Sequence, residues 1–199
     1  YSLAANQNHS DAQNNLGSIY YSGEYVPVDI DKAIHYYSLA ANQNNSYAQN
    51  NLGNIYYSGE YVPVDIDKAI HYYSLAANQN NSSAQNNLGN IYSEGEYVSV
   101  DINKAIHYYS LAANQNNSDA QYALGIIYSE GKYVSNNIKK AIHYFLLAAN
   151  QNDSDAQNNL GNIYYSGEYV SVDIDKAIHY FSLAANQNNS DAQYALGII

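Results

Sequence analysis

The sequence contains no cysteine, methionine, tryptophan or arginine, and it has only two prolines. Without cysteine, the 199-residue chain has no disulfide framework, no thiolate nucleophile and no Cys-ligated metal site. Its 7 basic residues are all lysines, and together with 18 acidic residues they give a net charge of −11. Because lysine and arginine supply most of the affinity for phosphates, this composition argues against a nucleic acid partner and a polybasic membrane contact.

Long apolar runs are also missing from the chain. No segment reaches the ~18 consecutive apolar residues of a membrane span, and no charged segment followed by an apolar one opens the sequence. We therefore expect no membrane insertion and a cytoplasmic location. The alternative is the ER lumen or secretion, if the N-x-S sequons carry glycans, although helix capping accounts for the same residues and is favoured. The sequon asparagines are Asn8, Asn44, Asn80, Asn81, Asn116, Asn152 and Asn188.

Tyrosine, by contrast, is abundant, with 25 copies against 2 phenylalanines, because the sequence is an internal repeat. Full copies of a 36-residue unit occupy residues 10–45, 46–81, 82–117, 118–153 and 154–189. Residues 1–9 match the end of a unit and residues 190–199 match the start of another, so we expect one continuous domain cut from a longer array. Periods of 20 to 50 residues are typical of solenoids, propellers and other arrays.

The first half of each unit has the pattern of a helix. In the first copy an apolar stripe recurs at helical spacing at Ala12, Leu16, Ile19 and Tyr20. Ser10 and Gln13 have the spacing of a capping box, which predicts Ser10 as the N-cap. Gly23 is predicted to adopt the left-handed conformation that ends the helix.

The second half of each unit predicts another helix. Asp29 is the expected N-cap, and Asn44 is the expected left-handed residue after the helix. Since no long stretch alternates like a strand, the unit is predicted to be an antiparallel helix hairpin. Stacked copies give an all-α fold, a right-handed α-α superhelix (solenoid) with a 36-residue period. Circular dichroism should then show roughly 70% helix, against about a third in an average globular protein.

The complete pattern resembles the Sel-1-like repeat, a relative of the tetratricopeptide repeat, over the whole chain. The matching residues of the first copy are Ala12, Leu16, Gly17, Tyr20, Gly23, Val26, Asp29, Lys32, Ala33, Tyr36, Tyr37, Ala40 and Ala41. Tyr25 stands where the family has a second loop glycine, and Asn44 replaces the glycine that closes the second helix. The resemblance implies an interaction scaffold, with adaptor roles in signalling or in assembly and quality-control complexes.

Glycine inside a helix costs about 1 kcal/mol relative to alanine, so its recurrence indicates a structural reason. Gly17 and its equivalents occupy the same helical position in every copy. We therefore predict that the first helix of each unit approaches a neighbouring helix closely at this glycine.

No catalytic motif, metal site or cofactor site is predicted. Equivalent histidines recur once per unit, at His35, His71, His107, His143 and His179. Stacked helices place such residues about 8–10 Å apart or more, too far to share one zinc ion, so we expect an exposed row on the convex face. Asp29 and Asp31 have the spacing of cation ligands, but a helix cap with a first-turn acid explains both.

The first helices are expected to line a concave groove that binds protein or peptide partners. Gln13, Asn14, Ser18 and Tyr21 are the positions left out of the predicted core, and amides suit the backbone of an extended peptide because they both donate and accept hydrogen bonds. In the fourth copy an apolar spot and a reversed loop charge replace polar and acidic residues. The predicted partner-binding residues are Asn14, Asn50, Asn54, Tyr57, Asn86, Asn90, Tyr122, Ile126, Lys132, Asn158, Asn162 and Tyr165.

Three functions are compatible with this pattern. The favoured one is a non-catalytic interaction scaffold. The alternatives are a repetitive structural spacer with no specific ligand, and the interaction arm of a larger enzyme such as a kinase or a ubiquitin-ligase complex. The pattern predicts neither a partner's identity nor an oligomeric state.

Overall fold

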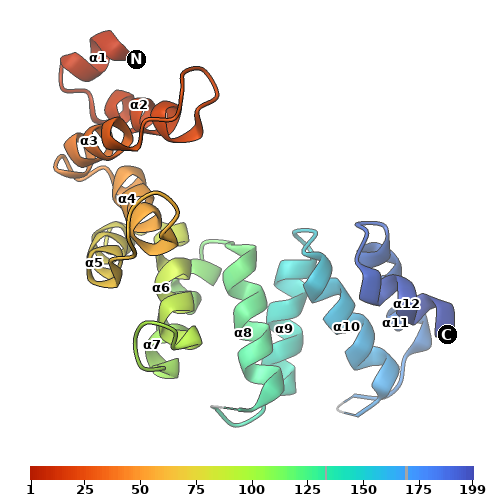
Figure 1. Cartoon of the computed structure of the whole chain (residues 1–199). Coiled ribbons are helices and arrows are strands. Elements are labelled where there is room, and N and C mark those ends of the chain that lie inside the picture. Colours follow the sequence, from red (N-terminus) through yellow and green to blue (C-terminus); the bar gives the residue numbers. More distant parts are fainter. Residues whose placement is uncertain (133, 169) are drawn as a thin grey trace. The chain divides into compact units, whose positions relative to one another are not determined.

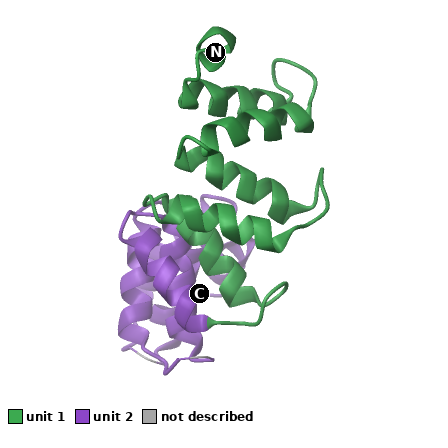
Figure 2. Ribbon diagram, turned by 90° about the vertical axis from the view of Figure 1, so that its left-hand side faces the viewer, with its two compact units in different colours: residues 1–101 green, residues 102–199 purple. Residues whose placement is uncertain are grey.

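A computed structural model describes residues 1–132, 134–168 and 170–199 of the chain. These residues form twelve helices and no strand, so the predicted all-α fold is confirmed (Figure 1). The chain divides into two compact units, unit 1 at residues 1–101 and unit 2 at residues 102–199 (Figure 2). None of the helices in the described ranges has the length and apolar character of a membrane span.

Each predicted hairpin appears as two consecutive helices. Unit 1 contains α1 (Ser2–Asn6), α2 (Ser10–Ser22), α3 (Ile30–Ala41), α4 (Ser46–Ser58), α5 (Ile66–Ala77) and α6 (Ser82–Glu94). Unit 2 contains α7 (Ile102–Ala113), α8 (Ser118–Glu130), α9 (Ile138–Ala149), α10 (Ser154–Ser166), α11 (Ile174–Ala185) and α12 (Ser190–Ile198). The even-numbered helices, which begin each repeat, are the A helices, and the odd-numbered helices from α3 to α11 are the B helices.

The core of each unit lies between A and B helices. In unit 1, α2 packs on α3 and α4 on α5, while α3 and α5 also contact the A helix that follows. Small side chains permit this double packing: Ala33, Ala40 and Ala48 are fully buried. The close approach predicted at the helical glycine is confirmed, because a Cβ atom added to Gly53 would lie 2.5 Å from Cδ1 of Tyr73.

Most of the predicted helix ends are confirmed. Asp29 caps α3, with its Oδ1 accepting a hydrogen bond from the Lys32 amide at 3.0 Å. The hydrogen bond of its side chain with Lys32 lowers the pKa of Asp29. Gly23 ends α2 with a φ of 70°, and Asn44 follows α3 with a φ of 61°. The B-to-A turn repeats this left-handed asparagine in every copy.

The predicted capping box at the start of the A helices is wrong. The residue before the serine is the N-cap: Asn45 has extended backbone angles, and its Oδ1 accepts from the Ala48 amide at 3.0 Å. Ser46 is already inside the helix. The left-handed Asn44 lies where the sequence predicts it, and the helix begins directly after Asn45, one residue earlier than the capping box predicts.

Gln13 and its equivalents in the other four complete repeats are buried, so the prediction that this position lies outside the core is also wrong. Gln49 Nε2 donates to the Ala41 carbonyl at 3.2 Å, and Gln49 Oε1 accepts from Gln79 Nε2 at 2.7 Å. The carbonyl lies at the end of a B helix, where it also accepts from the Asn44 amide of the turn at 2.9 Å. Gln49 therefore joins its A helix to the B helix before it and to the turn after its own hairpin, and Gln13, Gln121 and Gln157 make the same two contacts.

Candidate functional site

Except for Lys132, the predicted binding residues lie on one face of the A helices, here called the A-helix face and defined by the positions equivalent to Asn14, Ser18 and Tyr21. Their exposure is uneven. Asn54, Asn162 and Tyr165 are exposed, whereas Asn86 is only 8% exposed. The intermediate members are Asn14, Asn50, Tyr57, Asn90, Tyr122, Ile126 and Asn158.

Asparagines on this face hydrogen-bond to one another across successive A helices of unit 1. Asn51 Nδ2 donates to Asn14 Oδ1 at 3.2 Å, and Asn87 Nδ2 donates to Asn50 Oδ1 at 3.3 Å. Asn87 also donates to Asn54 Oδ1 at 3.2 Å. The donor position was absent from the predicted site, although the repeated Asn-Asn pair in the sequence was a signal for it. Part of the amide chemistry is thus used to join the repeats.

This asparagine ladder lacks a donor where a repeat carries alanine. Ala195 occupies the position of Asn51 and Asn87 in the last repeat, and Asn158 Oδ1 is buried without a hydrogen-bond partner. Asn86 Oδ1 of unit 1 is likewise buried and has no hydrogen-bond partner among the described residues. A buried acceptor without a donor is costly, which marks these two asparagines as exceptional.

Tyrosine hydroxyls complete the polar network of the A-helix face in unit 1. Tyr73 donates to Asn54 Oδ1 at 2.8 Å, and Tyr57 donates to Glu94 Oε2 at 3.1 Å. Burial and the nearby Glu94 carboxylate raise the pKa of Tyr57 to about 12, so this phenol stays protonated and acts as a donor. The Tyr57 ring also meets Tyr97 edge-on at 5.9 Å.

A small pocket recurs at the same place between successive A helices of unit 1. The pocket between α2 and α4 has a volume of about 60 Å³, and the one between α4 and α6 about 20 Å³. Both are lined by equivalent residues, in the second case Tyr57, Tyr73, Asn87, Asn90 and Ile91. Two tyrosines of the chain itself therefore line each of these small pockets.

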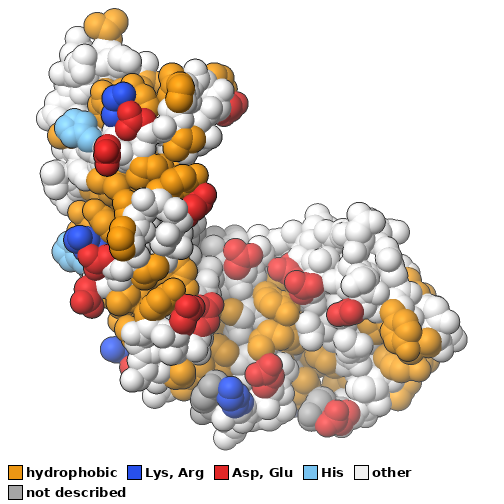
Figure 3. Space-filling view, in the orientation of Figure 1, with side chains coloured by type: hydrophobic (Ala, Val, Ile, Leu, Met, Phe, Trp, Pro, Cys, Tyr) orange, Lys and Arg blue, Asp and Glu red, His pale blue; other side chains and the backbone are white. Residues whose placement is uncertain are grey.

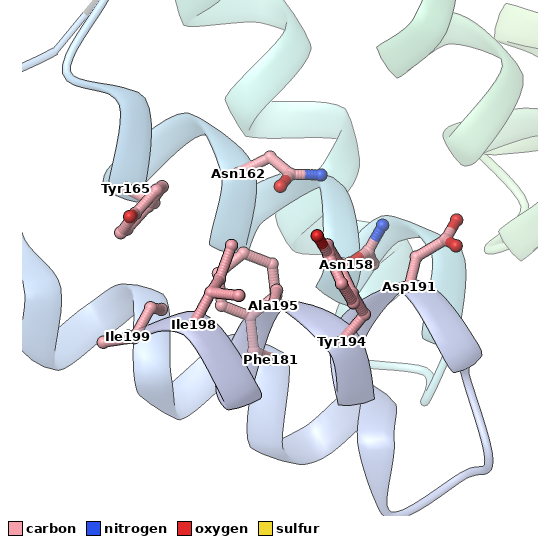
Figure 4. Close-up of a pocket in the computed structure, with 9 residues that line it drawn as sticks. All are labelled: Asn158, Asn162, Tyr165, Phe181, Asp191, Tyr194, Ala195, Ile198 and Ile199. Atoms are coloured by element: carbon pink, nitrogen blue, oxygen red, sulfur yellow. The ribbon is translucent and has the colours of Figure 1, made fainter.

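The equivalent pockets of unit 2 are larger. The α8–α10 pocket measures about 300 Å³, and its lining includes Ser129 and Phe145 where unit 1 has Tyr57 and Tyr73. The α10–α12 pocket measures about 330 Å³ and has Phe181 at the same place. Figure 4 shows the residues around the α10–α12 pocket: Asn158, Asn162, Tyr165, Phe181, Asp191, Tyr194, Ala195, Ile198 and Ile199. Volumes of this size approach the lower end of ligand sites.

The apolar spot predicted in the fourth repeat is only partly exposed. Tyr122 and Ile126 are half-buried and pack against the core cluster of α9 and α10, with the Tyr122 ring 6.0 Å from that of Phe145. Lys132 is exposed in the loop after α8. The pairing of Phe145 with Ile126 replaces the Tyr73 to Asn54 hydrogen bond by apolar packing. The role of these residues in binding remains a prediction.

The other candidate groups in the sequence are the B-helix histidines and the capping aspartates. The five B-helix histidines are exposed, as predicted. Within the described ranges, no three His, Cys, Asp or Glu side chains are grouped closely enough to hold a metal ion. Acidic side chains are scattered over the surface in Figure 3, with few lysines among them. Lys32 and Lys68 pair with the capping residues Asp29 and Asp65 at 2.7 and 2.8 Å.

Asp153 occupies a cap position that holds asparagine in most other copies. In unit 1, Asn45 Nδ2 donates to Asp11 Oδ1 at 2.8 Å. An ionised Asp153 has no hydrogen to donate. In its neighbourhood the position equivalent to Asp11 is held by Asp119. Burial raises the pKa of Asp153, and the nearby carboxylates of Asp155 and Asp119 raise it further. The structure therefore places a carboxylate where the other copies have an amide donor.

We expect Asp153→Asn to stabilise the chain at neutral pH by about 1 kcal/mol, since it adds a hydrogen bond to a charged acceptor and keeps the cap. Folding favours protonated Asp153, so wild-type stability falls as pH rises from the ordinary pKa of 3.8 through the raised folded value. The advantage of the variant should grow over that window and then stay constant. Thermal unfolding across the acidic range measures it, and an advantage independent of pH would contradict this interpretation.

A comparison with known protein families divides the chain at the same repeat boundaries. The family model of the Sel1 repeat matches residues 10–45, 46–81, 82–117, 118–153 and 154–189. No curated protein sequence matches the chain at a significant level.

Solved structures of similar proteins share the fold. The Escherichia coli protein c5321, described as a protective antigen of uropathogenic strains with an SLR fold, is 37% identical, with a TM-score of 0.93. The match covers 98% of this chain and 42% of c5321, so this chain spans less than half of that relative. A Sel1 repeat protein from Oxalobacter formigenes is 33% identical over 96% of this chain and 78% of its own, with a TM-score of 0.89. Helicobacter pylori cysteine rich protein B is 33% identical over 67% of this chain and 96% of its own, with a TM-score of 0.52.

Proposed function

Because the chain belongs to the Sel1 repeat family, we propose that it is a non-catalytic interaction scaffold that binds partner peptides or subunits along its A-helix face. Proteins of this family are generally protein-interaction scaffolds. The observation that carries the proposal is the pocket that recurs between successive A helices, at equivalent residues in both units. A row of equivalent pockets suits an extended chain whose side chains enter them in turn.

The chemistry of the A-helix face supports a peptide ligand. The exposed amide of Asn162 offers both a donor and an acceptor to a peptide backbone. Asn54, whose Oδ1 already accepts from Tyr73 and Asn87, offers its amide donor. Tyr165 adds an exposed aromatic ring, a residue type that contributes strongly to protein interfaces. The pockets of unit 2 provide apolar surface from Phe145 and Phe181.

Charge changes on the two faces test this function. Asn54→Lys and Asn162→Lys place cations on the A-helix face at exposed positions, while His71→Lys and His143→Lys do the same on the B helices. We expect capture of partner proteins from cells that contain the protein to be lost with the first pair and retained with the second. Retention by both pairs, or loss only with the histidine variants, would contradict the proposal. Capture of no protein by the unaltered chain would favour the structural spacer.

A further inference from the structure

The loops that join the A and B helices of unit 1 expose one tyrosine and one valine in every repeat. These side chains, here called the loop edge, are between 40% and 75% exposed and belong to Tyr25, Val28, Tyr61, Val64, Tyr97 and Val100. None of them lines the pockets of the A-helix face in unit 1. Three consecutive loops that leave the same two apolar positions uncovered form a repeated surface, which single exposed apolar residues do not.

The tyrosines of the loop edge are held in place although they are exposed. The Tyr61 ring meets Tyr21 of the preceding A helix edge-on, with 5.7 Å between the ring centroids. Tyr97 meets Tyr57 in the same way at 5.9 Å. Because these contacts restrict the rings before a partner binds, less side-chain entropy is lost on binding than with mobile rings.

Carboxylates lie beside these rings. Each loop carries one glutamate, one aspartate and no lysine, over residues 23–29, 59–65 and 95–101. A side-chain hydrogen bond with Glu60 raises the pKa of Tyr61. The same contact with Glu96 raises the pKa of Tyr97. Glu94 adds a carboxylate at the last residue of α6, where the helix dipole disfavours an anion and a bound cation would relieve it.

The chain itself shows how a cation binds to a tyrosine ring beside a carboxylate. Lys68 Nζ lies 4.9 Å from the centroid of the Tyr56 ring and 2.8 Å from Asp65 Oδ2. Cations are attracted both to the face of an aromatic ring and to a carboxylate. The loops that carry Tyr61 and Tyr97 provide the ring and the carboxylate but contain no lysine.

We propose that the loop edge of unit 1 binds lysine or arginine side chains of the partner peptide, an inference that rests on the proposed function. Each basic side chain places its charge over a tyrosine ring and beside the neighbouring glutamate. The exposed valines offer apolar surface to the methylene groups of the same side chain. Neighbouring repeats are about 10 Å apart, a distance that three residues of an extended chain span, so basic residues at every third position fit consecutive loops.

The fourth repeat lacks the features that select a basic residue. Its loop has Lys132 in place of the glutamate, Asn136 in place of the valine and Asn137 in place of the aspartate. A positive loop charge repels a basic partner. Glu130, the equivalent of Glu94 at the end of α8, precedes this lysine-containing loop and is therefore a matched control position.

A fluorescent peptide with arginine at every third position, Ser-Arg-Ser-Ser-Arg-Ser-Ser-Arg-Ser, tests the inference on the whole chain. The comparison peptide has glutamine in place of each arginine, and fluorescence anisotropy at physiological salt gives both affinities. We expect the arginine peptide to bind about tenfold more tightly, since only its side chains carry the charge that the rings and the carboxylates attract.

Single substitutions then separate the loop edge from the overall negative charge. Glu96→Gln and Tyr97→Leu should each weaken binding of the arginine peptide about threefold. Glu130→Gln changes the net charge by the same amount as Glu96→Gln and should leave the affinity unchanged. Tyr47→Leu should also leave it unchanged, because it removes an exposed ring at the start of α4, away from the loops.

Equal affinities of the arginine and glutamine peptides would overturn the inference. So would full affinity in Glu96→Gln and Tyr97→Leu, or equal weakening by Glu96→Gln and Glu130→Gln. Thermal unfolding of Tyr97→Leu, expected to be close to that of the unaltered chain, separates loss of the surface from loss of the fold. The proposed function has its own readout in the charge variants at Asn54 and Asn162. If those variants lose the captured partner while the peptides show no preference for arginine, only the specificity for basic residues fails.

Discussion

Gly53→Val is expected to destabilise unit 1 by about 3 kcal/mol, at the upper end of the cost of overpacking a well-packed core. Even the first added carbon would lie 2.5 Å from Cδ1 and 2.6 Å from Cε1 of Tyr73. The Tyr73 ring is 2% exposed and its hydroxyl is fixed by Asn54, so it cannot move aside without breaking other contacts. Denaturant unfolding followed by circular dichroism measures the loss.

The chain contains a matched control for this effect. Gly197 occupies the same repeat position in α12, and a Cβ atom added there meets nothing within 4 Å. Gly197→Ala should therefore be neutral or stabilising by up to about 1 kcal/mol, which is the helix propensity difference. Gly53→Ala should be destabilising despite the same propensity gain. If the two alanine variants behaved alike, close helix approach would not explain the recurring glycine.

Gln157→Leu is expected to cost about 2–3 kcal/mol, although leucine is apolar and similar in size. Gln157 is 1% exposed, and its Nε2 donates to the Ala149 carbonyl at 3.1 Å. Its Oε1 accepts from Gln187 Nε2 at 2.8 Å. The variant removes both hydrogen bonds. The buried Ala149 carbonyl at the end of α9 then keeps only the Asn152 amide, at 3.0 Å, as a donor, and its second lone pair is left without a partner. Denaturant unfolding of unit 2 is the measurement.

The Gln187→Leu variant is the control, because it removes only one hydrogen bond of the same network. Gln187 is exposed, and water can replace it as the partner of Gln157. We expect a loss of at most about 1 kcal/mol from this change. Equal losses in the two variants would show that the buried carbonyl is not the source of the effect.

The sequence predicts the helices, the caps of the B helices and the close contact at the helical glycine, because each follows from a local pattern. Asp29 caps its helix because the residue type and its spacing determine a local hydrogen bond. The A helix starts one residue before the predicted position, because Asn45 and Ser46 are both good caps and the local pattern does not decide which of them takes the extended conformation. Gln13 was assigned to the surface because its partners are distant in sequence, at Ala5 and Gln43.

The pockets of the A-helix face could not be predicted from the sequence in the same way. Their position depends on how successive A helices pack, because each lining combines the A and B helices of one repeat with the A helix of the next. The substitutions at Ser129 and Phe145 are visible in the sequence, but the volume that they accompany is not. The predicted asparagines do lie on this face, yet Asn14, Asn50 and Asn54 accept hydrogen bonds from asparagines outside the predicted set.

A photo-crosslinking amino acid at single positions tests the central claim, partner binding on the A-helix face, most directly. It is introduced at Asn54 or Asn162 on that face, and at His71 or His143 on the B helices, in cells that contain the protein. We expect the same partner to be crosslinked from both asparagine positions and from neither histidine position. Crosslinking of a partner from the histidine positions, with none from the asparagines, would contradict the assignment of the binding surface.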